Sequence, residues 1–136
     1  MRKFLFLSII IFCFLFIDGE AQDIIKFRAK YTSDMEYKRG YWSEWSEWQA
    51  TNILITIDIT DQRIKIFASS TNVLDIYDYE TKENSGSSIL YLYCIDDNGD
   101  RCRVRFRYDE NEDDRELYVD YPSFIVAYAL KPLSNY

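Results

Sequence analysis

The sequence predicts an all-β protein, an antiparallel meander of seven or eight strands that forms a small barrel or sandwich after a cleaved signal peptide. Apolar and polar residues alternate along most of the chain, and this period of two is typical of half-buried strands. Polar or glycine-containing segments such as KENSGS, DDNGD and DENEDD interrupt the alternation, as turns do. No amphipathic helix of three turns follows the N-terminal segment.

The N-terminal segment has the features of a signal peptide. A short basic head precedes the apolar run Phe4–Ile17, which is shorter than the ~20 apolar residues that a membrane span needs. Gly19 and Ala21 then place small residues at positions −3 and −1 of a cleavage site. We therefore expect residues 1–21 to be removed and residues 22–136 to form a single all-β domain. The protein is expected to be exported to the periplasm, the cell surface or the medium.

The expected strands follow from the positions of the alternating residues. The clearest case contains four isoleucines at every second position between residues 53 and 59. Asp61 and Gln62 form a turn, after which RIKIFA returns three apolar residues to one face. In chain order we expect strands at Ile25–Tyr31, Ile53–Ile59, Arg63–Ala68, Val73–Glu80, Ser88–Ile95, Cys102–Tyr108, Glu116–Tyr121 and Phe124–Leu130.

Two cysteines remain after signal cleavage, Cys94 and Cys102. A three-residue hairpin loop, Asp97-Asn98-Gly99, with the glycine in the left-handed conformation, places them directly opposite each other. Because export leads to an oxidising compartment, we expect a disulfide between them, and the alternative is a reduced pair in the core. The third cysteine, Cys13, leaves with the signal; a lipoprotein anchor there would need a small residue before it, where the sequence has phenylalanine.

The composition argues against several partners. The formal net charge is −7 and stays at −7 after signal cleavage, because two basic and two acidic residues are removed together. Nucleic-acid phosphates and anionic lipids repel such a chain, so neither is an expected partner, and no membrane span is expected after cleavage. The 12 tyrosines are typical of a chain that folds.

The residue types present also restrict the chemistry. The sequence has no histidine, which excludes Ser-His-Asp and Cys-His catalysis and histidine-ligated zinc. A carboxylate pair of the glycosidase kind is the remaining catalytic alternative, although an acidic chain always offers some pair. In DDNGD, Asp96–Asp100, the glycine comes fourth and not sixth as an EF-hand loop requires, and DENEDD is most simply a solvated turn. We expect no enzyme, no cofactor and no metal.

The most distinctive segment is WSEWSEW, which spaces Trp42, Trp45 and Trp48 three residues apart. It resembles the WSxWS box of class I cytokine receptors and the first strand of thrombospondin type 1 repeats, in which tryptophans interleave with arginines. RCRVRFR offers alternating arginines at Arg103–Arg107, and a guanidinium over an indole is favourable by ~0.5–1 kcal/mol. The six cysteines of a thrombospondin repeat are missing, and the receptor box follows its arginine strand whereas this segment precedes one. A Trp–Arg ladder formed independently of both families is therefore the hypothesis.

Two further resemblances concern the fold. GYW at Gly40–Trp42 resembles the GxW of lipocalins, whose tryptophan closes one end of an eight-stranded barrel. As a whole the chain resembles small exported all-β proteins of Bacteroidetes-type bacteria, through the cut before glutamine, the GYW-SEW segment, the RIKI hairpin, C-x-D-x-x-G-x-x-C and LYVDY. The resemblance implies export and a compact fold and carries no established activity.

Three functions are compatible with the sequence. The first is a non-catalytic binding protein that uses exposed aromatic residues to contact a protein or a glycan. Inhibition of a partner protein is one form of this function. The alternatives are a lipocalin-like barrel with a small apolar ligand and, with less support, a carboxylate-dependent hydrolase. The candidate contact residues are Trp42, Trp45, Trp48, Tyr41 and Arg105. In a regular strand a spacing of three alternates between faces, which predicts Trp42 and Trp48 inward and Trp45 outward.

Overall fold

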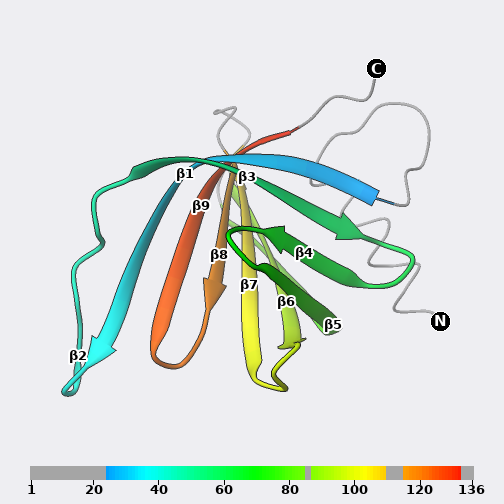
Figure 1. Cartoon of the computed structure of the whole chain (residues 1–136). Coiled ribbons are helices and arrows are strands. Elements are labelled where there is room, and N and C mark those ends of the chain that lie inside the picture. The colour runs from blue at the N-terminus through cyan, green and yellow to red at the C-terminus, as the bar shows by residue number, and fades with distance from the viewer. Residues whose placement is uncertain (1–23, 85–86, 110–114, 133–136) are drawn as a thin grey trace.

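In a computed structural model, nine β-strands make up the regular structure of the described residues, 24–84, 87–109 and 115–132 (Figure 1). The expected signal peptide, residues 1–21, lies outside them. No helix in the described part of the chain is long and apolar enough to cross a membrane. The strands are β1 (Ile24–Lys38), β2 (Tyr41–Trp42), β3 (Gln49–Asp58), β4 (Arg63–Phe67), β5 (Thr71–Asn84), β6 (Ser87–Asp96), β7 (Arg101–Asp109), β8 (Arg115–Asp120) and β9 (Phe124–Pro132).

The sheet closes into a barrel, which confirms the expected meander and selects the barrel over the sandwich. Each strand from β3 to β9 pairs antiparallel with the next, and β9 returns to pair with β1. Strand β2 is an additional short strand on the outer edge of β1. Closure removes the free edges that an open sheet would expose, so the barrel consists of eight strands plus β2.

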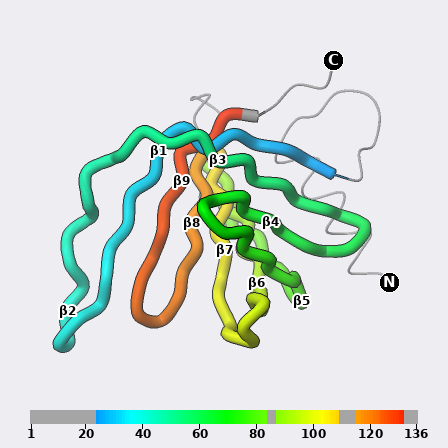
Figure 2. Tube along the Cα trace, in the orientation of Figure 1, coloured from blue at the N-terminus to red at the C-terminus, as the bar shows by residue number. Residues whose placement is uncertain are grey.

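Strand β1 makes the closure possible because it serves two neighbours. Residues 24–32 pair with β3, whereas residues 27–36 pair with β9. The register shifts between Ala29 and Tyr31, where a bulge bends the strand. In Figures 1 and 2, β1 crosses one end of the barrel and then turns to run beside β9. Its second half therefore extends to the end of the barrel where the β6–β7 and β8–β9 hairpins lie (Figure 2).

The barrel interior is filled by the apolar residues of the alternating pattern. Ile55, Ile57, Ile64 and Ile66 are buried, as the period of two predicts. Aromatic rings contribute as well, since Phe27 on β1 packs against Phe106 on β7 with ring centroids 5.5 Å apart. An eight-stranded barrel is narrow enough for side chains to fill, and this one is filled through most of its length.

The β6–β7 hairpin has the expected three-residue loop. The Asp96 N–H donates to the carbonyl of Asp100 at 2.8 Å, and the Gly99 N–H donates back to the Asp96 carbonyl at 3.0 Å. Gly99 has a φ of 85°, the left-handed conformation that suits glycine. The loop places Cys94 directly opposite Cys102, also as expected.

The disulfide predicted between these cysteines is absent, and this prediction is wrong for the structure. Both residues are free thiols, buried inside the barrel. Because Asp96 and Asp100 form a hydrogen-bonded pair, the alternation of the ladder makes Cys94 and Cys102 one too, and side chains stand farther apart there than at non-hydrogen-bonded pairs. The Cys94 thiol is within hydrogen-bond reach of the Leu92 carbonyl, with 3.6 Å between sulfur and oxygen, and it also interacts with the Cys102 thiol.

Candidate functional site

The WSEWSEW segment lies along the edge of the second half of β1, between β2 and β3. Ser46 bonds Asp34 twice: its N–H donates to the Asp34 carbonyl at 2.8 Å, and its Oγ accepts from the Asp34 N–H at 3.0 Å. Ser43 repeats this arrangement with Glu36, at 2.7 and 2.9 Å. Each serine hydroxyl therefore takes the place of a strand carbonyl. Three residues of the segment oppose two residues of β1, which explains the period of three.

A buried serine of β1, Ser33, makes a further hydrogen bond to the segment. Ser33 on β1 is the one buried polar residue within the described chain, and its Oγ donates to the Ser46 carbonyl at 2.6 Å. Directly across the sheet from Ser33 lies Ala127 on β9, which is also buried. The segment is thus held at both serines by several hydrogen bonds, which limits the motion of Trp45 between them and of the flanking Trp42 and Trp48 less directly.

All three tryptophans are exposed, so the prediction that Trp42 and Trp48 point inward is wrong. Their exposed fractions are 42%, 43% and 51% in chain order. The period-two rule fails here because the serines, at a period of three, occupy the edge of β1. The predicted contact residue Tyr41 is more exposed still, at 78%, and Tyr37 lies edge-on to Trp42 with centroids 5.3 Å apart. We call Tyr37, Tyr41, Trp42, Trp45 and Trp48 the aromatic surface.

Arg103 and Arg105 of β7 stack on tyrosines and not on tryptophans, so the hypothesis of a Trp–Arg ladder is wrong for these two arginines. Arg105 lies over Tyr118 on β8, with 4.4 Å from the guanidinium carbon to the ring centroid, and Arg103 lies over Tyr91 on β6 at 5.1 Å. Strands β8 and β9 separate β7 from the segment bound to β1, so the guanidinium groups do not reach the indoles directly. Tyr118 lies between the two groups, because it contacts Arg105 through its face and Trp45 in an edge-on arrangement.

Arg105, the fifth predicted contact residue, is held in place by Asp120. Its Nε and a terminal nitrogen donate to the two Asp120 oxygens at 2.6 and 2.8 Å, a bidentate pair. Arg103 donates to the same carboxylate at 3.1 Å. The geometry makes Arg105 a support for Tyr118 more than a free contact group, since its side chain is only 27% exposed.

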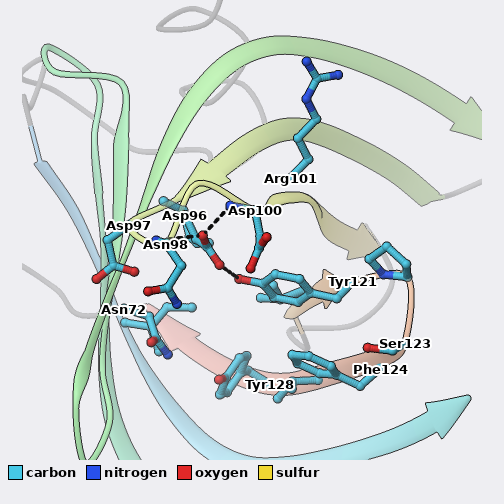
Figure 3. Close-up of a pocket in the computed structure, with 15 residues that line it drawn as sticks. Asn72, Asp96, Asp97, Asn98, Asp100, Arg101, Tyr121, Ser123, Phe124 and Tyr128 are labelled. Carbon is cyan, nitrogen blue, oxygen red and sulfur yellow. Dashed lines mark hydrogen bonds between the residues drawn. The ribbon is translucent and has the colours of Figure 1, made fainter.

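A second feature, which the sequence did not reveal, is a cavity of about 600 Å³ at the open end of the barrel (Figure 3). Its rim consists of the β6–β7 loop and the β8–β9 turn. Tyr121 and Phe124 stack on each other beside it, with centroids 4.6 Å apart and an interplanar angle of 19°. The apolar lining comes from Ile66, Leu74, Val119, Val126 and Tyr128.

Asp96 is the best-held polar group of the cavity. Its Oδ1 accepts from the N–H groups of Asn98 and Asp100 at 3.0 and 2.8 Å, and its Oδ2 accepts from the Tyr121 hydroxyl at 2.8 Å. Burial opposes the charged form, but these hydrogen bonds outweigh it and lower the pKa of Asp96. Burial and the same hydrogen bond raise the pKa of Tyr121. Asp96 is therefore ionised and Tyr121 neutral at physiological pH.

The remaining charges give the rim a negative balance. Asp97 and Asp100 are exposed, and neither makes an ion pair within the described residues. Arg101, the one cation of the lining, points away from the other labelled side chains in Figure 3. Its guanidinium lies 5.9 Å from the Tyr77 ring centroid instead.

The class of protein that these features define is an eight-stranded antiparallel barrel with an exposed aromatic surface and a cavity at the adjoining end. Comparisons with protein-family models, with curated proteins and with solved structures found no match.

Proposed function

We propose that this protein is an exported, non-catalytic binding protein whose aromatic surface docks onto a neutral glycan. The single observation that supports this most is the exposure of all three indoles on a segment fixed by serine hydrogen bonds. Burying an aromatic ring yields a large hydrophobic gain, so a chain that holds three of them in water presents them to a partner. Rings that are fixed beforehand lose little conformational entropy on binding.

The arrangement of the surface favours a glycan over a protein. Exposed Glu44 and Glu47 alternate with the tryptophans along the segment, so this surface carries carboxylates as well as rings, whereas the core of a protein interface is depleted of charged residues. Separate ring faces suit successive sugar rings, and the carboxylates can accept hydrogen bonds from sugar hydroxyls. The same carboxylates repel anionic glycans, so the partner is expected to be uncharged.

Binding of the intact protein to immobilised neutral polysaccharides, measured by retention and by tryptophan fluorescence, tests the proposal. We expect the wild type to be retained and the triple substitution Trp42→Ala, Trp45→Ala and Trp48→Ala to abolish retention. Phe67→Ala is the matched control, because Phe67 is an exposed aromatic residue on β4 outside the aromatic surface. Equal retention of wild type and triple variant contradicts the proposal. So does a protein partner that needs the tryptophans while no glycan is retained.

The lipocalin-like alternative has less room than an open barrel would offer. The apolar core occupies the interior along most of the strands, and the cavity of about 600 Å³ lies at the end of the barrel that the β6–β7 loop and the β8–β9 turn surround. A ligand of the barrel would therefore be small and would meet a polar rim as well as apolar walls.

A further inference from the structure

We propose that the cavity at the open end of the barrel binds a small organic cation, such as a quaternary ammonium group on a compact apolar body. This site is separate from the aromatic surface and does not depend on the function proposed for it.

The size of the cavity fits a small molecule. Its volume of about 600 Å³ falls within the range of ~300–1,000 Å³ that is typical of ligand pockets. The walls are built from side chains of β4, β5, β8 and β9, whose backbones are fixed by the closed sheet. The site is consequently preformed, which reduces the entropic cost of binding. Apolar residues such as Leu74 and Val126 face the body of the ligand.

The rim charges select a cation. Asp96 stays ionised because its three hydrogen bonds satisfy the carboxylate, and Asp97 and Asp100 lie in the same loop without ion pairs in the described part of the chain. Arg101 is the one cation of the lining, and its side chain points away from the other labelled side chains (Figure 3). The net field at the mouth is therefore negative, which attracts cations and repels carboxylates or phosphates.

The aromatic wall adds a second attraction for a cation that is not strongly hydrated. Tyr121 and Phe124 both line the cavity, and Tyr128 contributes a third ring at its base. Ring faces carry negative electrostatic potential, and cation–π contacts are stronger when water is excluded. A carboxylate rim combined with aromatic walls matches an alkylammonium ion better than it matches an uncharged lipid.

The arrangement fits an organic cation better than a metal ion. Calcium needs six to eight oxygen ligands around one point. Among the residues that the structure describes, no three acidic or cysteine side chains converge in this way. Asp96 already uses both oxygens in hydrogen bonds to its own loop and to Tyr121. The carboxylates are thus distributed along the rim of the cavity and do not converge on one point, which suits a molecular cation better than a metal ion.

Calorimetric and NMR titrations of the full protein with choline and with 3,3-dimethylbutan-1-ol test the charge requirement. The two probes have nearly the same shape, but only choline is charged. We expect choline to bind and to shift the resonances of the β6–β7 loop and the β8–β9 turn, and the neutral alcohol to bind at least about tenfold more weakly. Equal binding of both probes would overturn the proposal, as would binding of calcium chloride without binding of choline. Failure of choline and of benzyltrimethylammonium to bind would also overturn it.

Two variants localise the site. The double substitution Asp97→Asn and Asp100→Asn should weaken choline binding by about tenfold, while Asp61→Asn, which removes one carboxylate in the β3–β4 turn outside the cavity lining, should leave it unchanged. Phe124→Leu keeps an apolar side chain but removes a ring, and it should weaken choline more than the alcohol. Thermal unfolding of each variant verifies that the barrel is intact. A choline affinity that is the same in all variants would show that the cavity is not the binding site.

Discussion

Trp45 and Tyr118 meet edge to face, with their ring centroids 6.0 Å apart and an interplanar angle of 60°. Tyr118 also lies beneath the guanidinium of Arg105, and its hydroxyl donates to the Glu116 carboxylate. Burial and this hydrogen bond raise the pKa of Tyr118 to about 12. Tyr118 therefore links the tryptophan segment to the charged outer wall of β7 and β8, and it fixes one indole of the aromatic surface.

Replacing Tyr118 should release Trp45. We expect Tyr118→Leu to increase acrylamide quenching of Trp45 fluorescence, because the indole loses the ring that covers one edge, and to lower the free energy of unfolding by about 1 kcal/mol. The measurement is made with Trp42→Phe and Trp48→Phe in the background, so that Trp45 alone emits. Tyr118→Phe keeps the ring and is the control; it should leave quenching near that of the parent. Equal quenching in Tyr118→Leu and the parent would contradict the role of this contact.

The two serines of the segment should contribute to stability as caps of β1. Ser43→Ala and Ser46→Ala each remove a hydroxyl that accepts a β1 N–H, and each should lower the free energy of unfolding by about 1 kcal/mol. Ser69→Ala, an exposed serine in the β4–β5 loop, should have no measurable effect. Urea unfolding monitored by circular dichroism gives the values. Alanine variants as stable as the wild type would show that solvent replaces the hydroxyls without cost.

The strands were predictable wherever one face of a strand is buried. The alternating isoleucines of β3 and β4 pointed to strands that the structure confirms, because the core side of each strand must be apolar. The second half of β1, residues 32–38, was not predicted. Its sequence is mostly polar, and its pairing depends on β9, on β2 and on the serine hydroxyls, which period-two alternation does not reveal.

The two candidate sites differed in how visible they were from the sequence. The tryptophans stood out because their spacing is regular, but their direction depended on the backbone conformation between them, which the period of the serines determines. The cavity was not visible, because it brings together residues from Ile66 to Tyr128 that only the closed sheet makes neighbours. The sequence predicted DDNGD as a turn. That this turn forms part of the cavity rim depends on the β8–β9 turn, which lies across the cavity from it.

The hairpin between β1 and β2 offers a test of backbone strain. Arg39 and Gly40 have φ values of 55° and 84°, so both central residues of this two-residue turn are left-handed, as in a type I′ turn. A Cβ at position 40 meets no atom within 4 Å, so Gly40→Ala should cost about 1 kcal/mol through backbone conformation alone. Arg39→Asn should instead stabilise by about 0.5 kcal/mol, because asparagine tolerates this conformation better. Thermal unfolding measures the stability of both variants relative to the wild type. A stabilising Gly40→Ala together with a destabilising Arg39→Asn would contradict the type I′ turn.

The buried cysteines should be unreactive until the barrel opens. The hydrogen bond with Cys102 and burial both raise the pKa of Cys94, and the thiolate is the reactive form. We expect iodoacetamide to leave Cys94 and Cys102 unmodified in the native protein and to alkylate both in urea. Intact-mass measurement shows the number of adducts. A native protein that is lighter by two hydrogens and takes no adduct in urea without reductant would show a disulfide and contradict the free thiols.

The Asp96 carboxylate should make stability depend on acidity. Its pKa in the folded state is lowered below the ordinary value of 3.8, so its ionised form stabilises the fold above that pH, and this stabilisation is lost as the pH falls through the folded-state pKa. Asp96→Asn should therefore destabilise the protein at neutral pH, and the gap to the wild type should narrow below about pH 4. Asp97→Asn removes one charge from the same loop without breaking a hydrogen bond in the described chain. Its free energy of unfolding should therefore stay close to that of the wild type at every pH. Urea unfolding at a series of pH values supplies the comparison. A gap for Asp96→Asn that stays constant from neutral pH into acid would show that the hydrogen bonds do not favour the ionised carboxylate.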